Sequence, residues 1–257
     1  SLGLVGSEMC IRDRVYGGKL DDYGWGVTES IDGGYVIAGE TFSFGRGQSD
    51  IYLIKIDSTG NMIWNTTFGG LAEDVAYEVV NSDDGGFVVA SQTKSYGKGG
   101  SDGMIVKFNS DGIKEWHRLF GGKGLDYFKS ITVDSLKGYV LAGGTRSFDN
   151  GDSQGWLLSI NRDGFRRWEK TYGDKGEDAF NMITKTNFCE RFYNLSPKIC
   201  IYDLDGTIID SSHRATHDIN AKINRGNTLS SIGKDLIKSD VILTNPPFGT
   251  SSRLSLI

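Results

Sequence analysis

Short apolar runs alternate with polar turns along most of the chain, and this pattern predicts β-strands. Between residues 76 and 120, the runs "FVVAS" and "MIVKF" are apolar and partly β-branched, as expected of buried strands. The segments "DDGG" at 83–86 and "NSDG" at 109–112 contain Asn, Asp and Gly, which accept positive φ in hairpin turns at low cost. We therefore expect strands at about 76–81, 87–93, 103–109 and 114–120.

This pattern repeats every 52 residues, from "VYGGKLDDYGWG" at 15 through "TFGGLAEDVAYE" at 67 and "LFGGKGLDYFKS" at 119 to "TYGDKGEDAFNM" at 171. The residues that keep the step are Trp64, Trp116 and Trp168, and Asp22, Asp74, Asp126 and Asp178. Four strands per unit of this length resemble a β-propeller blade. The expected fold is all-β, a partial propeller of about three four-stranded blades. Closed propellers have at least about four blades, so we expect an open arc with an exposed blade face. The last complete blade and the truncated fourth should expose apolar strand surface that a neighbour normally covers.

The stretches "KIDSTGNMIW", "KFNSDGIKEW" and "SINRDGFRRW" resemble the tryptophan-docking repeats of quinoprotein-type propellers. They are also similar to glycine-rich repeats of secreted bacterial and archaeal propeller proteins. The resemblance implies tryptophans packed between blades, an extracellular or cell-surface location, and a protein or glycan ligand on one propeller face. The Asp/Asn-to-Trp spacing is one residue shorter than in the quinoprotein form, so we expect no quinone cofactor.

The repeated aspartates fit two roles, a ring facing the central channel or acceptors for backbone N–H groups in turns, and the turn role is favoured. The pairs Ser49-Asp50 and Ser101-Asp102 would suit a cation, but the third copy is Ser153-Gln154. His117 is isolated in the repeat. No grouping of nucleophile, base and orienting residue stands out, so the repeat is expected to be a binding scaffold and not an enzyme.

Composition changes near residue 185. The chain has 36 glycines and three prolines, yet all the prolines and only four glycines lie beyond Asn181. We therefore divide it into propeller repeats at 15–184 and an incomplete α/β remnant at 185–257.

The net charge of -5 and the lack of a basic run do not suggest a nucleic-acid surface. No apolar run is long enough to span a membrane, and the three cysteines form no metal-site pattern.

The first 14 residues stand apart from the repeat. Within them, "LVGSEMCIRDR" resembles the translation of a sequencing adapter, so residues 1–14 are expected to be non-native.

The remnant contains "KICIYDLDGTIIDSS" at 198–212, which resembles motif one of haloacid-dehalogenase-like phosphohydrolases. The resemblance implies Asp203 as nucleophile, Asp205 as general acid/base, Thr207 beside them, and Mg²⁺ held by the two carboxylates. A carboxylate can form an aspartyl-phosphate, and a divalent cation would offset the repulsion between the pair. The later Ser/Thr, Lys and acidic pair of that family are not found. Mg²⁺ is therefore expected only if this motif is active, and no other cofactor is expected.

A second motif, "NPPF" at 245–248, resembles motif four of amino-group DNA methyltransferases of the N6-adenine type. The resemblance implies that Asn245, Pro246 and Pro247 accept hydrogen bonds from the target amino group and that Phe248 stacks on the flipped base. Nucleic acid is a partner only if this motif functions, and its glycine-rich cofactor loop is missing. Two unrelated motifs without their partners indicate a chimeric reading frame.

Overall fold

The computed structural model describes residues 14–148, 152–173, 176–186, 198–203 and 208–209. These residues form strands, turns and loops. Within them there is no helix long and apolar enough to cross a membrane.

Three four-stranded antiparallel sheets follow one another along the chain. The first contains β1 (Asp22–Glu29), β2 (Tyr35–Thr41), β3 (Asp50–Ile56) and β4 (Met62–Phe68). The second contains β5 (Asp74–Asn81), β6 (Phe87–Thr93), β7 (Asp102–Phe108) and β8 (Lys114–Phe120). The third contains β9 (Asp126–Val133), β10 (Tyr139–Thr145), β11 (Gln154–Ile160) and β12 (Arg166–Tyr172). The expected all-β fold with three four-stranded blades is confirmed.

The expected strands of the second unit are confirmed with small shifts at their ends. β5 begins at Asp74 instead of 76, and β7 runs Asp102–Phe108 instead of 103–109. The turns between them close as their residues predict. The Gly85 N–H donates to the Ser82 carbonyl at 3.1 Å, and Gly85 has a φ of 82°. Positive φ without strain is what glycine provides at such a turn.

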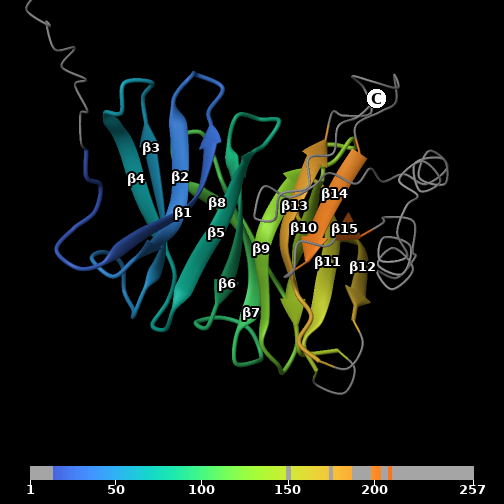
Figure 1. Cartoon of the computed structure of the whole chain (residues 1–257). Helices are drawn as coiled ribbons and strands as arrows, with labels where there is room; N and C mark the ends of the chain where they lie inside the picture. Colours follow the sequence, from blue (N-terminus) through green and yellow to red (C-terminus); the bar gives the residue numbers. More distant parts are fainter. Residues whose placement is uncertain (1–13, 149–151, 174–175, 187–197, 204–207, 210–257) are drawn as a thin grey trace, which may run out of the picture.

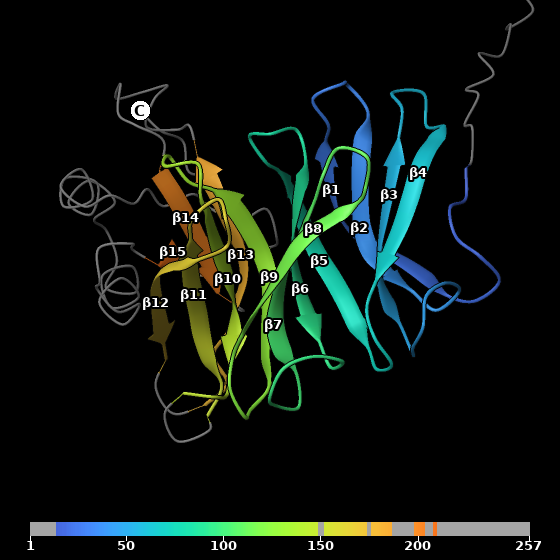
Figure 2. The ribbon, with the colours of Figure 1, turned by 180° about the vertical axis from the view of Figure 1, so that it is seen from behind.

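The sheets stand side by side, and their first strands form an inner wall (Figure 1). Within each sheet the strands keep chain order, so the first and fourth strands are its two edges. β1 contacts β5, β5 contacts β9, and β9 contacts β13 (Phe180–Thr186). Figure 2 shows the same succession of sheets from behind. This arrangement is that of propeller blades around an axis, with the first strand of each blade innermost.

The hydrophobic core lies between successive sheets. We call the face toward the preceding sheet the front and the face toward the next sheet the rear. The first junction packs Val36, Ala38, Ile51 and Leu53 against Ala76, Val79, Phe87, Val89, Met104, Val106 and Phe108. The second packs Val88, Ala90 and Ile105 against Phe128, Ile131, Tyr139, Leu141, Trp156, Leu158 and Ile160. Because the second and third sheets are covered on both faces, their third strands are buried along their whole length.

The two ends of the array differ. At the third sheet, Val140, Ala142 and Leu157 pack against Phe180 and Ile183 of β13. The expectation of exposed apolar surface on the last complete blade is therefore wrong, because β13 of the fourth unit covers it. At the other end, Val27 and Tyr35 on the front of the first sheet are 64% and 40% exposed. Tyr52 and Ile54 of the same face are only 4% and 5% exposed, so the blade face at this end is exposed in part.

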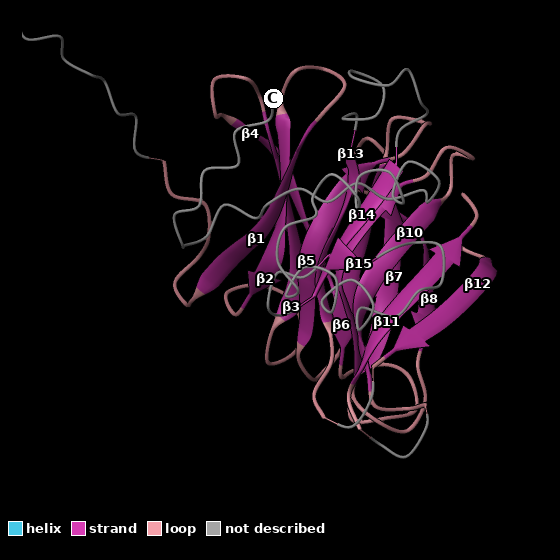
Figure 3. Cartoon of the chain, turned by 45° about the vertical axis from the view of Figure 1, so that its right-hand side comes forward, coloured by secondary structure: helices cyan, strands magenta, loops and turns pink. Residues whose placement is uncertain are grey.

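A further sheet joins the start of the fourth unit to the region predicted as a separate remnant. β14 (Lys198–Asp203) pairs antiparallel with β13 and with β15 (Ile208–Ile209). Figure 3 shows β14 and β15 at this end of the array. β14 thus holds the place beside β13 that a second strand holds in the other sheets. Most of the region 185–257 lies outside the described residues.

Candidate functional site

Three of the repeated aspartates, Asp22, Asp74 and Asp126, begin the first strands of their sheets and hold the loops before them, and Asp178 lies just before β13. The Asp74 carboxylate accepts hydrogen bonds from the Gly70 N–H at 2.7 Å, from the Ser95 hydroxyl at 2.6 Å and from the Thr93 hydroxyl. The same three bonds recur at Asp22, from Gly18, Thr41 and Ser43, and at Asp126, from Gly122, Thr145 and Ser147. Three of the four carboxylates therefore serve as acceptors for loop donors, which is the turn role.

Backbone hydrogen bonds at these aspartates also connect neighbouring sheets. The N–H groups of Asp74, Asp126 and Asp178 donate to the carbonyls of Ser49, Ser101 and Ser153, at 2.9, 3.0 and 2.9 Å. Asp74 and Asp126 are fully buried, whereas Asp22 is half-buried. Although burial alone would raise the pKa of Asp22, the hydrogen bonds from Thr41, Gly18 and Ser43 outweigh it and lower the pKa.

The Ser-Asp pairs that suggested a cation also serve loops. The Asp50 carboxylate accepts the N–H groups of Arg46 and Gly47 at 2.8 and 3.3 Å, and Asp102 repeats this arrangement in the second sheet. No group of three or more His, Cys, Asp or Glu side chains that could hold a metal ion occurs in the described part of the chain.

The repeated tryptophans lie where adjacent sheets meet. Trp64 of the first sheet donates its indole N–H to the Ser110 carbonyl of the second at 3.1 Å. A Cβ added at Gly112 in the same turn would come within 2.9 Å of the Trp64 ring, so this glycine allows the close approach. Trp116 lies equally close to Gly164 of the third sheet. Trp168, for which the next such turn is not described, remains 41% exposed.

Only part of the tail motifs lies within the described residues. Asp203 ends β14, and its side chain is not among the described atoms. Asp205, Thr207, Asn245, Pro246, Pro247 and Phe248 lie outside the described residues. Both motif assignments stay predictions.

His117 does not belong to a catalytic grouping. Its ring lies 5.3 Å from Phe68 and 5.9 Å from Tyr96, between the first and second sheets. Burial, with Lys114 and Arg118 nearby, lowers its pKa. We interpret it as a packing residue of the blade interface.

A row of side chains that the sequence analysis did not single out lines the inner wall. Each first strand contains a register shift, and the residue left without a cross-strand partner recurs at the 52-residue step. These residues are Trp25, Tyr77, Lys129 and Asn181, which we call the inner row. A β-bulge redirects its extra residue away from the regular alternation, and bulges are frequent beside functional sites.

Two of the three neighbouring pairs in the inner row contact each other across a blade junction. The rings of Trp25 and Tyr77 lie 6.4 Å apart. The Tyr77 hydroxyl donates to the Gln92 side-chain carbonyl at 3.0 Å. The Lys129 ammonium lies 3.4 Å from the side-chain oxygen of Asn181 and 5.6 Å from the centre of the Tyr127 ring.

Two more aromatic rings extend the exposed surface of the row. Tyr23 stacks on Trp25 at 6.1 Å and meets Phe42 edge-on at 6.4 Å. Trp25, Tyr23 and Phe42 are 55%, 47% and 39% exposed. Together with Tyr77 they form what we call the aromatic patch. Rings that could have been buried but are held in contact with solvent are typical of binding surfaces.

The electrostatics of the row keep its phenol groups protonated. Burial, with a smaller contribution from the Glu40 carboxylate, raises the pKa of Tyr77 to about 12. Burial also raises the pKa of Tyr127. Both phenols therefore remain neutral around pH 7. The row offers two aromatic faces and the Tyr77 hydroxyl at one end, and an ammonium and an amide at the other.

Beside the inner row, Glu78 joins the second sheet to the third. One of its carboxylate oxygens accepts both the Ser130 hydroxyl at 2.5 Å and the Ile131 N–H at 2.7 Å. Burial raises the pKa of Glu78, although the two hydrogen bonds act in the opposite direction. Ser130 in turn accepts the Ile183 N–H at 2.9 Å, which joins the third sheet to β13. These contacts hold successive inner strands in fixed register.

We expect Glu78→Gln to keep both hydrogen bonds, since a single amide oxygen can accept both donors. The raised pKa means that the folded state binds a proton more tightly than the unfolded state. Stability from this group is therefore full below its unfolded value of 4.5 and is lost as pH rises through the folded pKa. Urea denaturation at several pH values should show that Glu78→Gln removes this decline.

The matched variant Glu78→Ala leaves the Ser130 hydroxyl and the Ile131 N–H without their acceptor. Its free energy of unfolding should fall by about 1–3 kcal/mol at every pH. Equal stability of the Gln and Ala variants would contradict a bridging role for this side chain.

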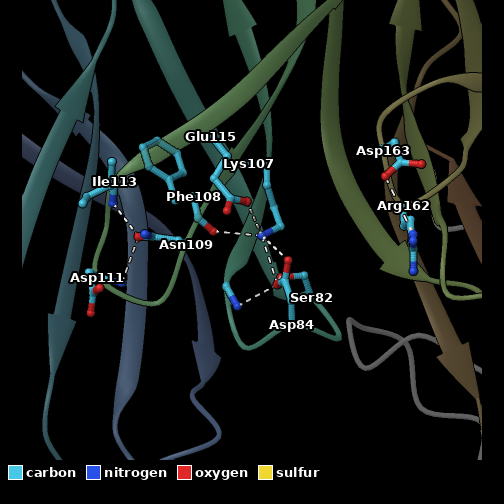
Figure 4. A network of polar contacts seen from close by, with 11 residues as sticks. Ser82, Asp84, Lys107, Phe108, Asn109, Asp111, Ile113, Glu115, Arg162 and Asp163 are labelled. Carbon is cyan, nitrogen blue, oxygen red and sulfur yellow. Dashed lines mark hydrogen bonds and ion pairs between the residues drawn. The ribbon is translucent and has the colours of Figure 1, made fainter.

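A polar network lies on a turn of the second sheet (Figure 4). The buried Lys107 ammonium contacts Asp84 at 2.9 Å and Glu115 at 2.8 Å, and it donates to the Phe108 carbonyl at 3.3 Å. Although burial alone would raise it, hydrogen bonds from Ser82, Lys107 and Gly86 lower the pKa of Asp84 to about 2. The three donors of the ammonium are taken by groups of its own sheet, so the network stabilises the turn and Lys107 has no donor left for a ligand.

No family model matches the chain, and no curated protein does. The structure is similar to a protein of unknown function from Bacteroides caccae, with a TM-score of 0.43 and 13% identity; the match covers 74% of this chain and 61% of that one. It is also similar to an arabinanase of Bacillus subtilis, with a TM-score of 0.38 and 11% identity over 74% of this chain and 76% of that one. A third similar structure is an exo-1,5-α-L-arabinanase from a bovine ruminal metagenomic library, with a TM-score of 0.36 and 10% identity over 79% of each chain.

Proposed function

We propose that the propeller part of this chain is a non-catalytic binding module that holds its ligand along the inner row. The observation that carries the proposal is the aromatic patch, in which three rings are more than a third exposed although they contact one another. The carboxylates of Asp22, Asp74 and Asp126 and the Lys107 ammonium are occupied by contacts within the scaffold. The inner row is where polar and aromatic groups face outward from a rigid framework.

The chemistry of the row favours a glycan. Sugar rings have apolar C–H faces that stack on aromatic side chains, and hydroxyl rims that need hydrogen-bond partners. Trp25 and Tyr77 supply the stacking surface, while Lys129 and Asn181 supply donors and an acceptor further along the wall. The first strands also place successive groups of the row on successive sheets, so an elongated chain would contact several blades. A secreted or cell-surface location is part of this proposal.

We expect Trp25→Ala to weaken glycan binding. Tryptophans at the centre of binding surfaces contribute about 2 kcal/mol or more, so the Kd should rise about thirtyfold or more. Affinity electrophoresis with xylan, a soluble β-glucan and pectin would identify a ligand. Titration of the tryptophan fluorescence would then give the Kd of each variant.

The control is Trp168→Ala, which removes a tryptophan of comparable exposure, 41% against 55%, from the fourth strand of the third sheet. It should leave the Kd unchanged. Because Trp25 is largely exposed, thermal unfolding of Trp25→Ala should match that of the unmodified chain. Retention of none of the polysaccharides, or equal loss of affinity in both variants, would contradict the proposal.

A further inference from the structure

Lys129 carries the positive charge of the inner row, and its contacts satisfy that charge only in part. The side chain is half-buried. Its ammonium lies 3.4 Å from the side-chain oxygen of Asn181, which is long for a hydrogen bond, and 5.6 Å from the centre of the Tyr127 ring. An amide oxygen and a ring face offer only partial negative charge, so neither contact supplies a full counter-charge for the ammonium.

Two more deeply buried lysines of the repeat show the partner that Lys129 lacks. Lys55 pairs with Asp32 at 2.6 Å, and Lys107 pairs with Asp84 at 2.9 Å. In the part of the chain that the structure describes, no carboxylate pairs with Lys129 in this way. Removing a cation from water is unfavourable unless a partner offsets the lost hydration. We therefore interpret the two paired lysines as structural and Lys129 as able to take an anionic partner from outside.

The other charged groups near the row do not cancel the charge of Lys129. The Arg146 guanidinium and the Glu177 carboxylate both act on Tyr127, but they pair with each other. At the opposite end of the row, the half-buried Glu40 carboxylate acts on the phenol of the aromatic patch. The row is therefore positive at the Lys129 end and negative at the aromatic end, so an anionic group fits only at the Lys129 end.

We propose that the glycan held along the inner row is acidic and that an anionic group of one of its sugars binds the Lys129 ammonium beside the Asn181 amide. This inference rests on the binding module proposed above. A carboxylate and a sulfate ester both fit, because a lysine ammonium acts as a point charge and does not select one shape of anion. The hydrogen bond is charge-assisted, so it is stronger than one between neutral groups. Neighbouring sugars of the chain then lie toward Tyr77 and Trp25.

The charge of the whole chain cannot produce this preference. The formal net charge is -5, which disfavours nonspecific binding of a polyanion. Binding of an acidic polymer therefore requires a local positive site. Because salt screens such an attraction, the Kd should increase as the NaCl concentration is raised. Binding of an uncharged polymer by stacking alone should show little dependence on salt.

The test is affinity electrophoresis of the full chain in polymers that differ in charge. Polygalacturonate and alginate supply carboxylates, carrageenan supplies sulfate esters, and fully methyl-esterified galacturonan and a soluble β-glucan are uncharged. We expect retention by at least one acidic polymer, and weaker retention by its uncharged counterpart. Lys129→Gln should raise the Kd of the retained polymer about tenfold and remove its salt dependence. Lys129→Arg keeps the charge and should retain most of the affinity.

Lys123→Gln is the matched control, since it removes the same charge from an exposed lysine in the loop before β9. It should leave the Kd unchanged, and the Tm of all three lysine variants should match that of the unmodified chain. Retention by the uncharged polymers alone would overturn the acidic ligand and leave the glycan proposal standing. Retention by none of the polymers would contradict both. Equal loss of affinity in Lys129→Gln and Lys123→Gln would overturn the position of the anion at Lys129.

Discussion

Trp156→Ala should lower the free energy of unfolding by about 3–5 kcal/mol, the range for large-to-small changes of buried aromatic residues. Trp156 is fully buried on the front of the third sheet, and its ring stacks on Phe128 with 4.3 Å between centroids. Its indole N–H donates to the Glu169 carboxylate at 2.9 Å. The alanine therefore leaves a cavity in the second junction and removes a hydrogen bond from a charged acceptor. Urea denaturation followed by circular dichroism would measure the loss.

Trp156→Phe is the informative companion to this variant, because it keeps an aromatic ring beside Phe128 but lacks the N–H. It should recover most of the lost stability. Trp168→Ala, which changes an exposed ring, should cost much less than Trp156→Ala. Comparable losses from the two alanine variants would contradict the location of the core between the second and third sheets.

Asp126→Ala should destabilise the protein by about 3–5 kcal/mol, since it removes one charged acceptor that serves three donors in a buried site. The Gly122 N–H, at 2.8 Å, and the hydroxyls of Thr145 and Ser147 lose their partner. The Asp126 N–H also donates to the Ser101 carbonyl of the second sheet, and the alanine retains this backbone bond, so the expected loss is that of the three side-chain contacts. Thermal and urea unfolding would both report it.

Asp111→Ala provides the control for charge. Asp111 lies in an exposed turn, where its backbone N–H donates to the Asn109 side chain and the alanine retains that bond. Its stability should stay within about 0.5 kcal/mol of the unmodified chain. Asp126→Asn should lie between the two, because an amide has one acceptor oxygen in place of two. An Asp126→Ala variant as stable as Asp111→Ala would show that the loop does not depend on the repeated aspartate.

The sequence was sufficient for the strands and the sheets because local and global signals agree. The 52-residue period fixes the number of units, and turns such as the one ending at Gly85 fix where the strands reverse. Interpreting the repeated aspartates as turn acceptors also depended only on local chemistry. Each of these features involves residues close in sequence or equivalent by the repeat.

The features that the sequence did not reveal depend either on residues that differ between the repeat units or on the exact cross-strand pairing of the strands. Trp156 occupies a position that is Tyr52 in the first unit and Met104 in the second. Because the residue type changes from unit to unit, the repeat does not mark this position as important, although Trp156 is a fully buried core residue. The inner row was missed because strict alternation places residues 24 and 26 on one face, whereas the register shift falls between them and redirects Trp25. Motif similarity in the tail identified Asp203 and Asp205 without showing which residues lie around them.

The pairing of β14 with β13 has a consequence for how the array ends. β14 comes from "KICIYD", which has no counterpart in the repeat, yet it forms an antiparallel ladder with the first strand of the fourth unit. Main-chain hydrogen bonds do not depend on side-chain identity, so an unfinished blade presents a template to any strand-forming segment nearby. The last strand of such an array can accept a further strand at its free edge. A segment from elsewhere in the chain can supply that strand and so satisfy the main-chain hydrogen-bonding groups of the edge.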